Sequence, residues 1–182
     1  MEDEFRLKKD SSIKPRVLKD IMNIGAYGFF DSATKDVIFV VGVVLRISNS
    51  HSYNFQLQCG IVSNMKVELL ALWCLCKIAS ILGVVILKVY GDSRVTIKYE
   101  QGEFNLGVVS LLPWCNRICS ELKNICHISF HHIYQEQNQL ADKLSKSALK
   151  GKEGWLHWEE WMDNLQTDSG LINIFFLSLV SV

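Results

Sequence analysis

The sequence predicts an α/β fold: one mixed five-stranded sheet, made of three antiparallel strands and then two parallel crossover strands, with helices on both faces. Three strand-like stretches follow one another within residues 26–61, joined by short connectors that suit an antiparallel meander. Two further strand-like stretches are then separated by helical patterns, as in parallel crossover connections. With 182 residues and 49% hydrophobic content, the chain can bury one core.

The first three stretches differ in pattern but all favour strands. Ala26–Ser32 is short and aromatic, and Val37–Ile47 is long and β-branched. Tyr53–Ile61 alternates apolar and polar residues, which is typical of a strand with one buried face.

A long helix is predicted from Met65 to about Leu82, capped by Ser63 or Asn64. It is apolar around most of its circumference, so we expect it to be buried, with Glu68 in its first turn. The later elements follow in order: strand Val84–Tyr90, helix Ser93–Tyr99, helix Val108–Asn124, strand His127–Ile133 and helix Gln139–Lys150, capped by Asn138.

The predicted domain organisation is a flexible leader over residues 1–24, one domain over 25–151, and a partly helical tail over 152–182. The leader is polar, with one short helix possible at 16–22. In the tail, three tryptophans stand at three-residue spacing, which favours a helix that packs on the body over one that stacks on a ligand: Trp155, Trp158 and Trp161.

Charge and hydropathy exclude several classes of protein. The net charge is zero, so no global field points to nucleic acid or to a membrane. The charged N-terminus does not resemble a signal peptide, and Leu171–Val182 is about half of the roughly 20 apolar residues that a membrane helix needs. We expect an intracellular monomer without a membrane anchor, with nucleus, cytoplasm and organelles all open.

The six cysteines do not form a secreted disulfide framework, because four of them lie in helical patterns. Reduced and mostly buried thiols are expected. A zinc site that joins Cys126 to a nearby histidine is disfavoured, because the paired CxxC spacing is missing.

Four acids stand at positions where they could meet: Asp31, Glu68, Asp92 and Asp142. Each has an ordinary explanation, since acids favour helix N-termini and Asp92 could cap the helix that follows it; Asp31, within a strand, has the weakest one. A coincidence of all four is harder to explain, because clustered carboxylates repel one another unless a cation compensates them. Oxygen ligands of this kind suit Mg²⁺ or Mn²⁺, and a pair of such ions is typical of phosphodiester hydrolysis.

The segments that carry these acids resemble ribonuclease H type 1, and are most similar in style to the ribonuclease H-like domains of plants and plant retroelements. They are FFDSA (29–33), SNMKVELLAL (63–72), VYGDS (89–93) and HHIYQEQNQLADKLSK (131–146). The resemblance implies that Asp31, Glu68, Asp92 and Asp142 bind two Mg²⁺ or Mn²⁺ ions with substrate and catalyse hydrolysis of the RNA strand of an RNA–DNA hybrid.

The resemblance also assigns roles to four further residues. His132 matches a histidine that assists proton transfer or product departure, although a surface histidine at a strand end is an equal alternative. The remaining three match positions that bind the nucleic-acid backbone, with helix capping as the alternative for each: Asn64, Ser93 and Asn138. An A-like hybrid with a wide minor groove would be recognised by shape rather than by sequence.

The sequence departs from the family beside the first aspartate. Ser32 replaces a usual glycine, and residues 34–37 form a shorter turn without glycine. Two functions therefore stay open: a metal-dependent endonuclease, and a catalytically impaired domain that binds nucleic acid or protein. A 3′–5′ exonuclease of related fold is a weaker third hypothesis, because it needs the acids in other motifs.

Overall fold

The computed structural model describes residues 25–100 and 109–179. The predicted leader with its short helix, and most of the loop before the second long helix, lie outside these ranges. Among the described residues, no helix combines the length and the apolar character that crossing a membrane requires. All six cysteines fall within the described ranges and are free thiols.

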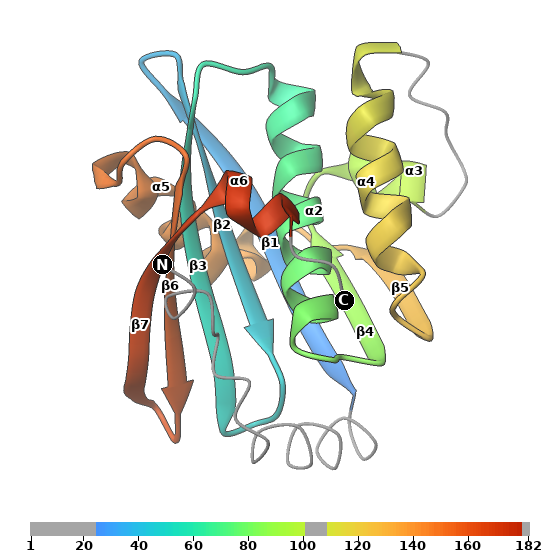
Figure 1. The fold of residues 1–182 in the computed structure, drawn as a ribbon, viewed down its shortest axis with the longest axis vertical. Coiled ribbons are helices and arrows are strands. Elements are labelled where there is room, and N and C mark those ends of the chain that lie inside the picture. The colour runs from blue at the N-terminus through green and yellow to red at the C-terminus, as the bar shows by residue number, and fades with distance from the viewer. Residues whose placement is uncertain (1–24, 101–108, 180–182) are drawn as a thin grey trace.

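The strands form one mixed sheet of seven strands in the order β5-β4-β1-β2-β3-β6-β7 (Figure 1). The five strands that the sequence predicts make up the first five positions, and β1 lies between β2, which is antiparallel to it, and β4, which is parallel. The strands are β1 (Ala26–Lys35), β2 (Ile38–Arg46), β3 (His51–Gly60), β4 (Ile86–Gly91), β5 (His127–His132), β6 (Trp155–Met162) and β7 (Leu165–Asn173).

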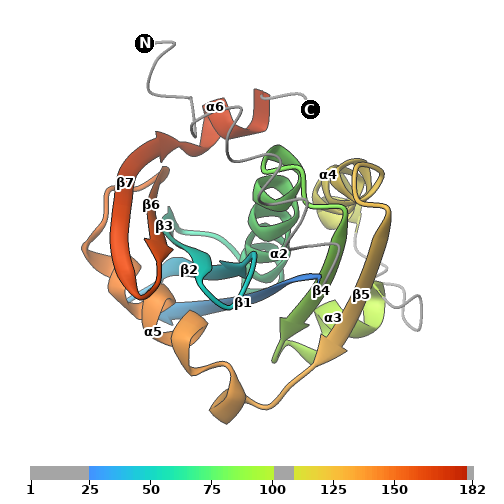
Figure 2. The same cartoon turned by 90° about the horizontal axis from the view of Figure 1, so that it is seen from below.

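Helices cover both faces of the sheet, as predicted. α2 and α4 lie on one face, and α5 lies on the other (Figure 2). The helices are α2 (Asn64–Ile81), α3 (Arg94–Glu100), α4 (Leu112–Leu122), α5 (Gln139–Ser147) and α6 (Ile174–Leu179), with short 3₁₀ turns at Val109–Leu111, Gln135–Gln137 and Ala148–Lys150.

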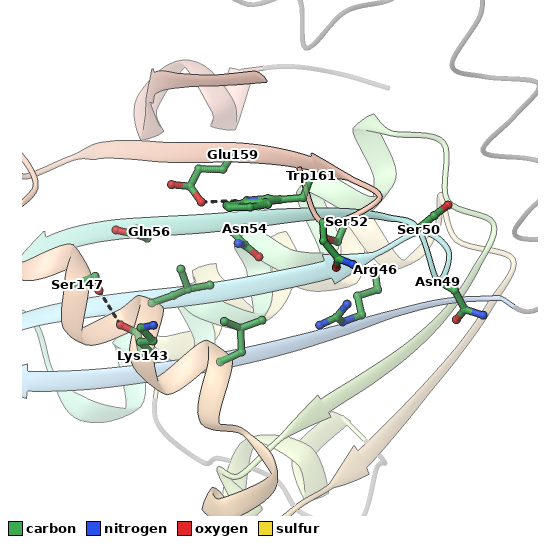
Figure 3. Close-up of a pocket in the computed structure, with 13 residues that line it drawn as sticks. Arg46, Asn49, Ser50, Ser52, Asn54, Gln56, Lys143, Ser147, Glu159 and Trp161 are labelled. Atoms are coloured by element: carbon green, nitrogen blue, oxygen red, sulfur yellow. Dashed lines mark hydrogen bonds between the residues drawn. The ribbon is translucent and has the colours of Figure 1, made fainter. Parts of the chain in front are cut away.

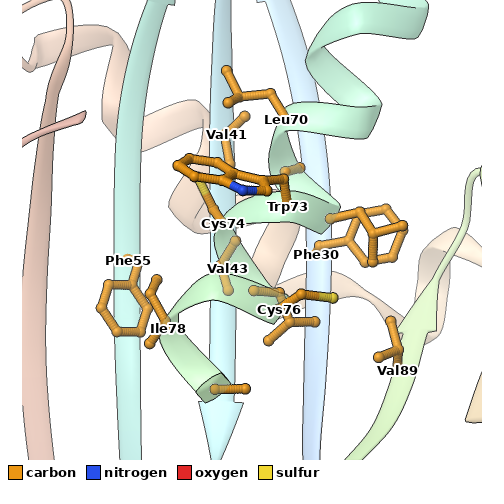
Figure 4. Close-up of a cluster of buried hydrophobic side chains, with 14 of the residues drawn as sticks. Phe30, Val41, Val43, Phe55, Leu70, Trp73, Cys74, Cys76, Ile78 and Val89 are labelled. Carbon is orange, nitrogen blue, oxygen red and sulfur yellow. The ribbon is translucent and has the colours of Figure 1, made fainter. Parts of the chain in front are cut away.

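The core lies between the sheet and α2. Trp73 and Cys76 of α2 pack among Phe30 of β1, Val43 of β2 and Phe55 of β3 (Figure 4). The helix is apolar around more than its sheet-facing side because α4 packs beside it on the same face.

Ser63 is the residue that caps α2. Its Oγ accepts a hydrogen bond from the backbone N–H of Lys66 at 3.3 Å, so the helix begins at Asn64. The prediction that Glu68 lies in the first turn is therefore wrong: Glu68 is the fifth residue of the helix, just beyond that turn. Glu68 therefore lies outside the first turn, where the free backbone N–H groups of the helix would stabilise a carboxylate.

The helical interpretation of the three tryptophans is wrong. Residues 155–173 form the β6–β7 hairpin, which adds two strands to the edge of β3 and explains why the sheet has seven strands rather than five. Trp158 lies opposite Phe55 of β3 in the pairing register. Asp163 and Asn164 both have positive φ, 51° and 63°, as the two-residue turn of a tight hairpin requires. Only α6, after the hairpin, fits the predicted helical character of the tail.

Candidate functional site

Asp31, within β1, and Asp92, directly after β4, lie side by side where β4 ends. Phe30 of β1 pairs with Gly91 of β4, so the next residue of each strand falls at the same end of the sheet. Asp31 is 6% exposed, although it is a carboxylic acid within a strand. The prediction that adjacent strands bring these two acids together is confirmed.

Glu68 approaches this pair from α2. Its Oε1 accepts a hydrogen bond from the hydroxyl of Ser32, the residue after Asp31. Its Oε2 is buried, and no residue within the described ranges gives it a hydrogen bond. A buried carboxylate oxygen without a partner is costly, so this oxygen is available as a ligand.

Asp142 approaches from α5, on the opposite face of the sheet. Ser145, one turn further along α5, donates a hydrogen bond to Oδ2 of Asp31 at 3.3 Å and to the backbone carbonyl of Asp142 at 2.8 Å. The Asp142 carboxylate itself accepts a hydrogen bond from Nζ of Lys146 at 2.7 Å. The Ser145 hydroxyl thus lies between the Asp31 carboxylate and the backbone of Asp142. Lys146 compensates the charge of the Asp142 carboxylate.

Gly42 allows α5 to lie this close to the sheet. It pairs with Asp31 across β1 and β2. A Cβ at this position would lie 2.2 Å from the carbonyl oxygen of Ala141 and 2.4 Å from the backbone nitrogen of Ser145. Only glycine leaves room for this approach of helix backbone to strand.

The surroundings raise the pKa values of the two inner acids. Burial, followed by repulsion from Asp92 and Asp142, raises the pKa of Asp31 to about 7. Burial also raises the pKa of Glu68 to about 7; repulsion from Asp31 and Asp92 adds to it, and hydrogen bonds from Ser32 and Ser93 oppose it. The charges of the neighbouring acids therefore act on both Asp31 and Glu68, while Asp142 is paired with Lys146.

The donor set fits a hard divalent cation, because it consists of carboxylate oxygens, one of which lacks a partner. Within residues 25–100 and 109–179, however, no group of three or more histidine, cysteine or acidic side chains stands close enough to hold an ion. The acids come from the predicted elements and influence one another, but as placed they do not form a closed coordination sphere.

The three predicted backbone-binding residues have different surroundings. Asn64 is exposed at the first residue of α2, and the Ser93 hydroxyl lies 2.9 Å from that of Thr96. Asn138 is buried; its Nδ2 donates to the carbonyl of Phe30 at 2.9 Å, and its Oδ1 has no hydrogen-bond partner in the part of the chain that the structure describes. Its side chain therefore ties the start of α5 to β1. Asn138 does stand directly before α5, but its side chain makes no capping hydrogen bond, so the predicted side-chain cap is wrong.

His132 is half-buried at the end of β5, where it pairs with Gly91, the residue before Asp92. Its ring meets Tyr134 edge to face, with 5.8 Å between ring centroids. The predicted histidine thus lies at the same sheet edge as Asp92.

Three functional neighbours of the acids escaped the sequence prediction: Ser145, Gly42, and Ser32 as a hydrogen-bond donor. The three-residue separation of Asp142 and Ser145 on one helix was the available signal for Ser145. The other contacts depend on how the helices pack on the sheet, which no local pattern reports.

Known proteins support the fold independently. A family model described as reverse transcriptase-like matches residues 30–148. None of the curated protein sequences compared with this chain matches significantly.

Solved structures align with the chain at low sequence identity. Ribonuclease H1 from Halobacterium salinarum matches with a TM-score of 0.63 and 23% identity over 70% of this chain and 98% of its own. The N-terminal RNase H domain of a Mycobacterium tuberculosis protein matches with a TM-score of 0.62 and 17% identity, over 68% of this chain and 92% of its own. LC11-RNase H1, solved in complex with an RNA/DNA hybrid, matches with a TM-score of 0.62 and 19% identity, over 68% of this chain and 95% of its own. The chain therefore belongs to the reverse transcriptase-like family, and its domain has the ribonuclease H fold.

Proposed function

We propose that this protein is a metal-dependent endonuclease that hydrolyses the RNA strand of RNA–DNA hybrids. The observation that carries the proposal is that the buried Asp31 and the half-buried Glu68 stand beside two further acids, with pKa values raised to about 7. Such a group is costly for stability, and a structural role alone does not require it. The ribonuclease H fold makes phosphodiester hydrolysis the reaction class that best matches this chemistry.

Asp31, Glu68, Asp92 and Asp142 would hold Mg²⁺ or Mn²⁺ in two positions. When bound, the ions activate the attacking water and stabilise the leaving oxygen. The chain's own residues orient these ligands: Ser145 fixes Asp31, and Ser32 fixes Glu68. Lys146 bonds to the Asp142 carboxylate, which would leave this lysine to bind an ion. His132, at the same sheet edge, would transfer a proton when the product leaves.

The proposed substrate follows from fold and from surface chemistry. A protein of the same fold was solved with an RNA/DNA hybrid, which supports a hybrid as the ligand. Asn64 and Ser93 would contact the backbone near the acids, whereas Asn138, which is buried and bonded to the Phe30 carbonyl, would act by holding α5 against β1. Exposed lysines on α3 and α5, such as Lys98 and Lys146, would neutralise phosphates.

The alternative is a catalytically impaired domain that binds nucleic acid. Two observations keep it open. Ser32 engages Glu68 where the family usually has glycine. The turn after β1 places Val37, a β-branched residue, at φ 63°, which is strained.

A cleavage assay separates the two functions. Wild-type protein and Asp92→Asn are incubated with a labelled RNA–DNA hybrid and Mg²⁺ or Mn²⁺, with circular dichroism as the control for folding. Hybrid cleavage by the wild type alone supports the endonuclease. Folded wild-type protein that cleaves with neither ion rules it out and favours the impaired domain.

A further inference from the structure

A polar groove lies on the α5 face of the sheet, and none of the four acids lines it. Its volume is about 390 Å³, within the roughly 300–1,000 Å³ that small-molecule sites occupy. Figure 3 shows that β2, β3, β6 and α5 contribute its walls. The α5 residues that line it, such as Lys143 and Ser147, differ from those that contact the acids, Asp142 and Ser145.

The groove exists because α5 is too short to cover the widened sheet. The helix spans nine residues and packs mainly on β1 and β2, whereas the β6–β7 hairpin extends the sheet beyond β3. Along β3, core residues alternate with outward polar ones, and the outward ones line the groove: Ser52, Asn54 and Gln56. This sheet face is therefore polar and open where a helix would otherwise cover it.

The charges in the groove favour an anionic ligand. Arg46 and Lys143 are the cations that line it, and Glu159 is the acid. The Glu159 carboxylate accepts a hydrogen bond from Nε1 of Trp161 at 3.1 Å. This bond occupies the polar edge of the indole and fixes the orientation of the ring, which lies among the other lining residues of the groove (Figure 3).

We propose that this groove binds a segment of single-stranded nucleic acid. Trp161 provides a ring on which a base stacks, which is the main sequence-tolerant contact to single strands. Arg46 and Lys143 pair with phosphates. Asn54 and Gln56 donate and accept hydrogen bonds at base edges, as amide side chains on an open sheet face can do.

A second hollow continues the path of the proposed strand. It has a volume of about 360 Å³, and it shares Arg46 and Leu140 with the groove. Tyr27 and Phe29 of β1 line it and add further aromatic rings. Together the two hollows pass along α5 and give room for more than one nucleotide.

This site does not depend on the proposed cleavage. Binding is therefore measured in EDTA, by fluorescence anisotropy of a short labelled oligonucleotide of mixed sequence, with RNA and DNA as separate arms. Trp161→Ala is expected to weaken binding at least about five-fold, the lower end of what one stacked base contributes, and Trp161→Phe to retain most of it. Lys143→Ala is compared with Lys123→Ala, which removes an exposed lysine at the end of α4.

The outcomes are decisive in both directions. Weakening by Trp161→Ala and Lys143→Ala, but not by Lys123→Ala, supports the groove even if the protein cleaves no hybrid. If the wild type binds neither the RNA nor the DNA oligonucleotide, the proposal is overturned. It is also overturned if Lys143→Ala and Lys123→Ala weaken binding equally. Unfolding curves exclude misfolding, and Arg46→Ala provides a second groove variant if Trp161→Ala does not fold.

Discussion

The hydroxyl of Ser32 on β1 donates a hydrogen bond to the carboxylate of Glu68 on α2. The contact joins the residue after one acid of the site to another acid of the site. It also lowers the pKa of Glu68, against the larger effect of burial. The serine therefore has a chemical consequence, because it favours the ionised form of the Glu68 carboxylate.

Removal of this hydroxyl should move the pH dependence of cleavage. In Ser32→Ala, Glu68 loses a hydrogen bond that favours its charged form, so its pKa rises above about 7 and the acidic limb of the rate profile shifts to higher pH. The measurement is the hybrid cleavage rate from pH 6 to 9 with Mg²⁺. Ser129→Ala is the control, because Ser129 bonds to His131 away from the acids. An unchanged profile in Ser32→Ala would show that Glu68 does not control the rate.

The raised pKa values also predict how stability depends on pH. Asp31 and Glu68 titrate near pH 7 when folded but near their ordinary values of 3.8 and 4.5 when unfolded. Between about pH 4 and 7 the folded state therefore holds more protons, so the free energy of unfolding falls as pH rises through this window. At pH 8 Asp31→Asn should be more stable than the wild type by about 1–3 kcal/mol, since one pKa unit corresponds to about 1.4 kcal/mol.

Urea unfolding at pH 5 and pH 8 in EDTA measures this difference. Glu136→Gln, which changes an exposed acid outside the site, is the control and should show no gain. Added Mg²⁺ at pH 8 should raise the melting temperature of the wild type but not that of Asp31→Asn combined with Glu68→Gln. Equal stabilisation of both proteins would show that the ion binds elsewhere.

Gly42→Ala should separate α5 from the sheet. The new Cβ would fall 2.2 Å from a backbone oxygen of α5, and backbone cannot rotate away as a side chain can. We expect a loss of about 1–3 kcal/mol in the free energy of unfolding and a loss of Mg²⁺-dependent stabilisation, because Asp142 moves with the helix. Gly151→Ala is the comparison variant, since alanine adopts its φ of −77° and the new Cβ would lie 3.1 Å from the Ala148 carbonyl oxygen, so the loss should be much smaller. Wild-type stability in Gly42→Ala would contradict the close approach.

The sequence predicted the parts of the fold and the site that depend on local pattern. Alternation and β-branched runs report strands directly, so β1 to β5 and their order were correct. Asp31 and Asp92 could be placed together because parallel neighbours in one sheet end at the same edge. The contacts of Ser145 and Gly42 could not be predicted, because they depend on the distance at which α5 packs on β2.

The C-terminal hairpin shows where a pattern is ambiguous. Three-residue spacing puts Trp155, Trp158 and Trp161 near one another on a helix, but on a strand it puts the middle one on the opposite face. Tertiary pairing with β3 decided between them, and the Asp163-Asn164 turn was the local signal that favoured a hairpin.

Glu160 should hold the hairpin to the rest of the sheet. Its Oε1 accepts hydrogen bonds from Tyr53 at 2.6 Å and lies 2.9 Å from Nε2 of His51, all three being buried. The His51 contact is the main cause that lowers the pKa of Glu160. Because this folded pKa lies below the unfolded value of 4.5, the stabilisation is present above pH 4.5 and is lost as pH falls through the folded pKa.

Glu160→Ala should therefore cost about 2–4 kcal/mol at pH 7, since hydrogen bonds to a charged group contribute about 1.5–3 kcal/mol and both partners stay buried. Urea unfolding measures the loss, and hydrogen exchange of β6 and β7 amides locates it. Glu159→Gln, on the opposite face of the same strand, should change stability by less than about 0.5 kcal/mol. If Glu160→Ala unfolds like the wild type while exchange in the hairpin stays slow, the apolar contacts of Leu156 and Trp158 with the core hold the hairpin instead, because these two side chains pack on the same face as Glu160.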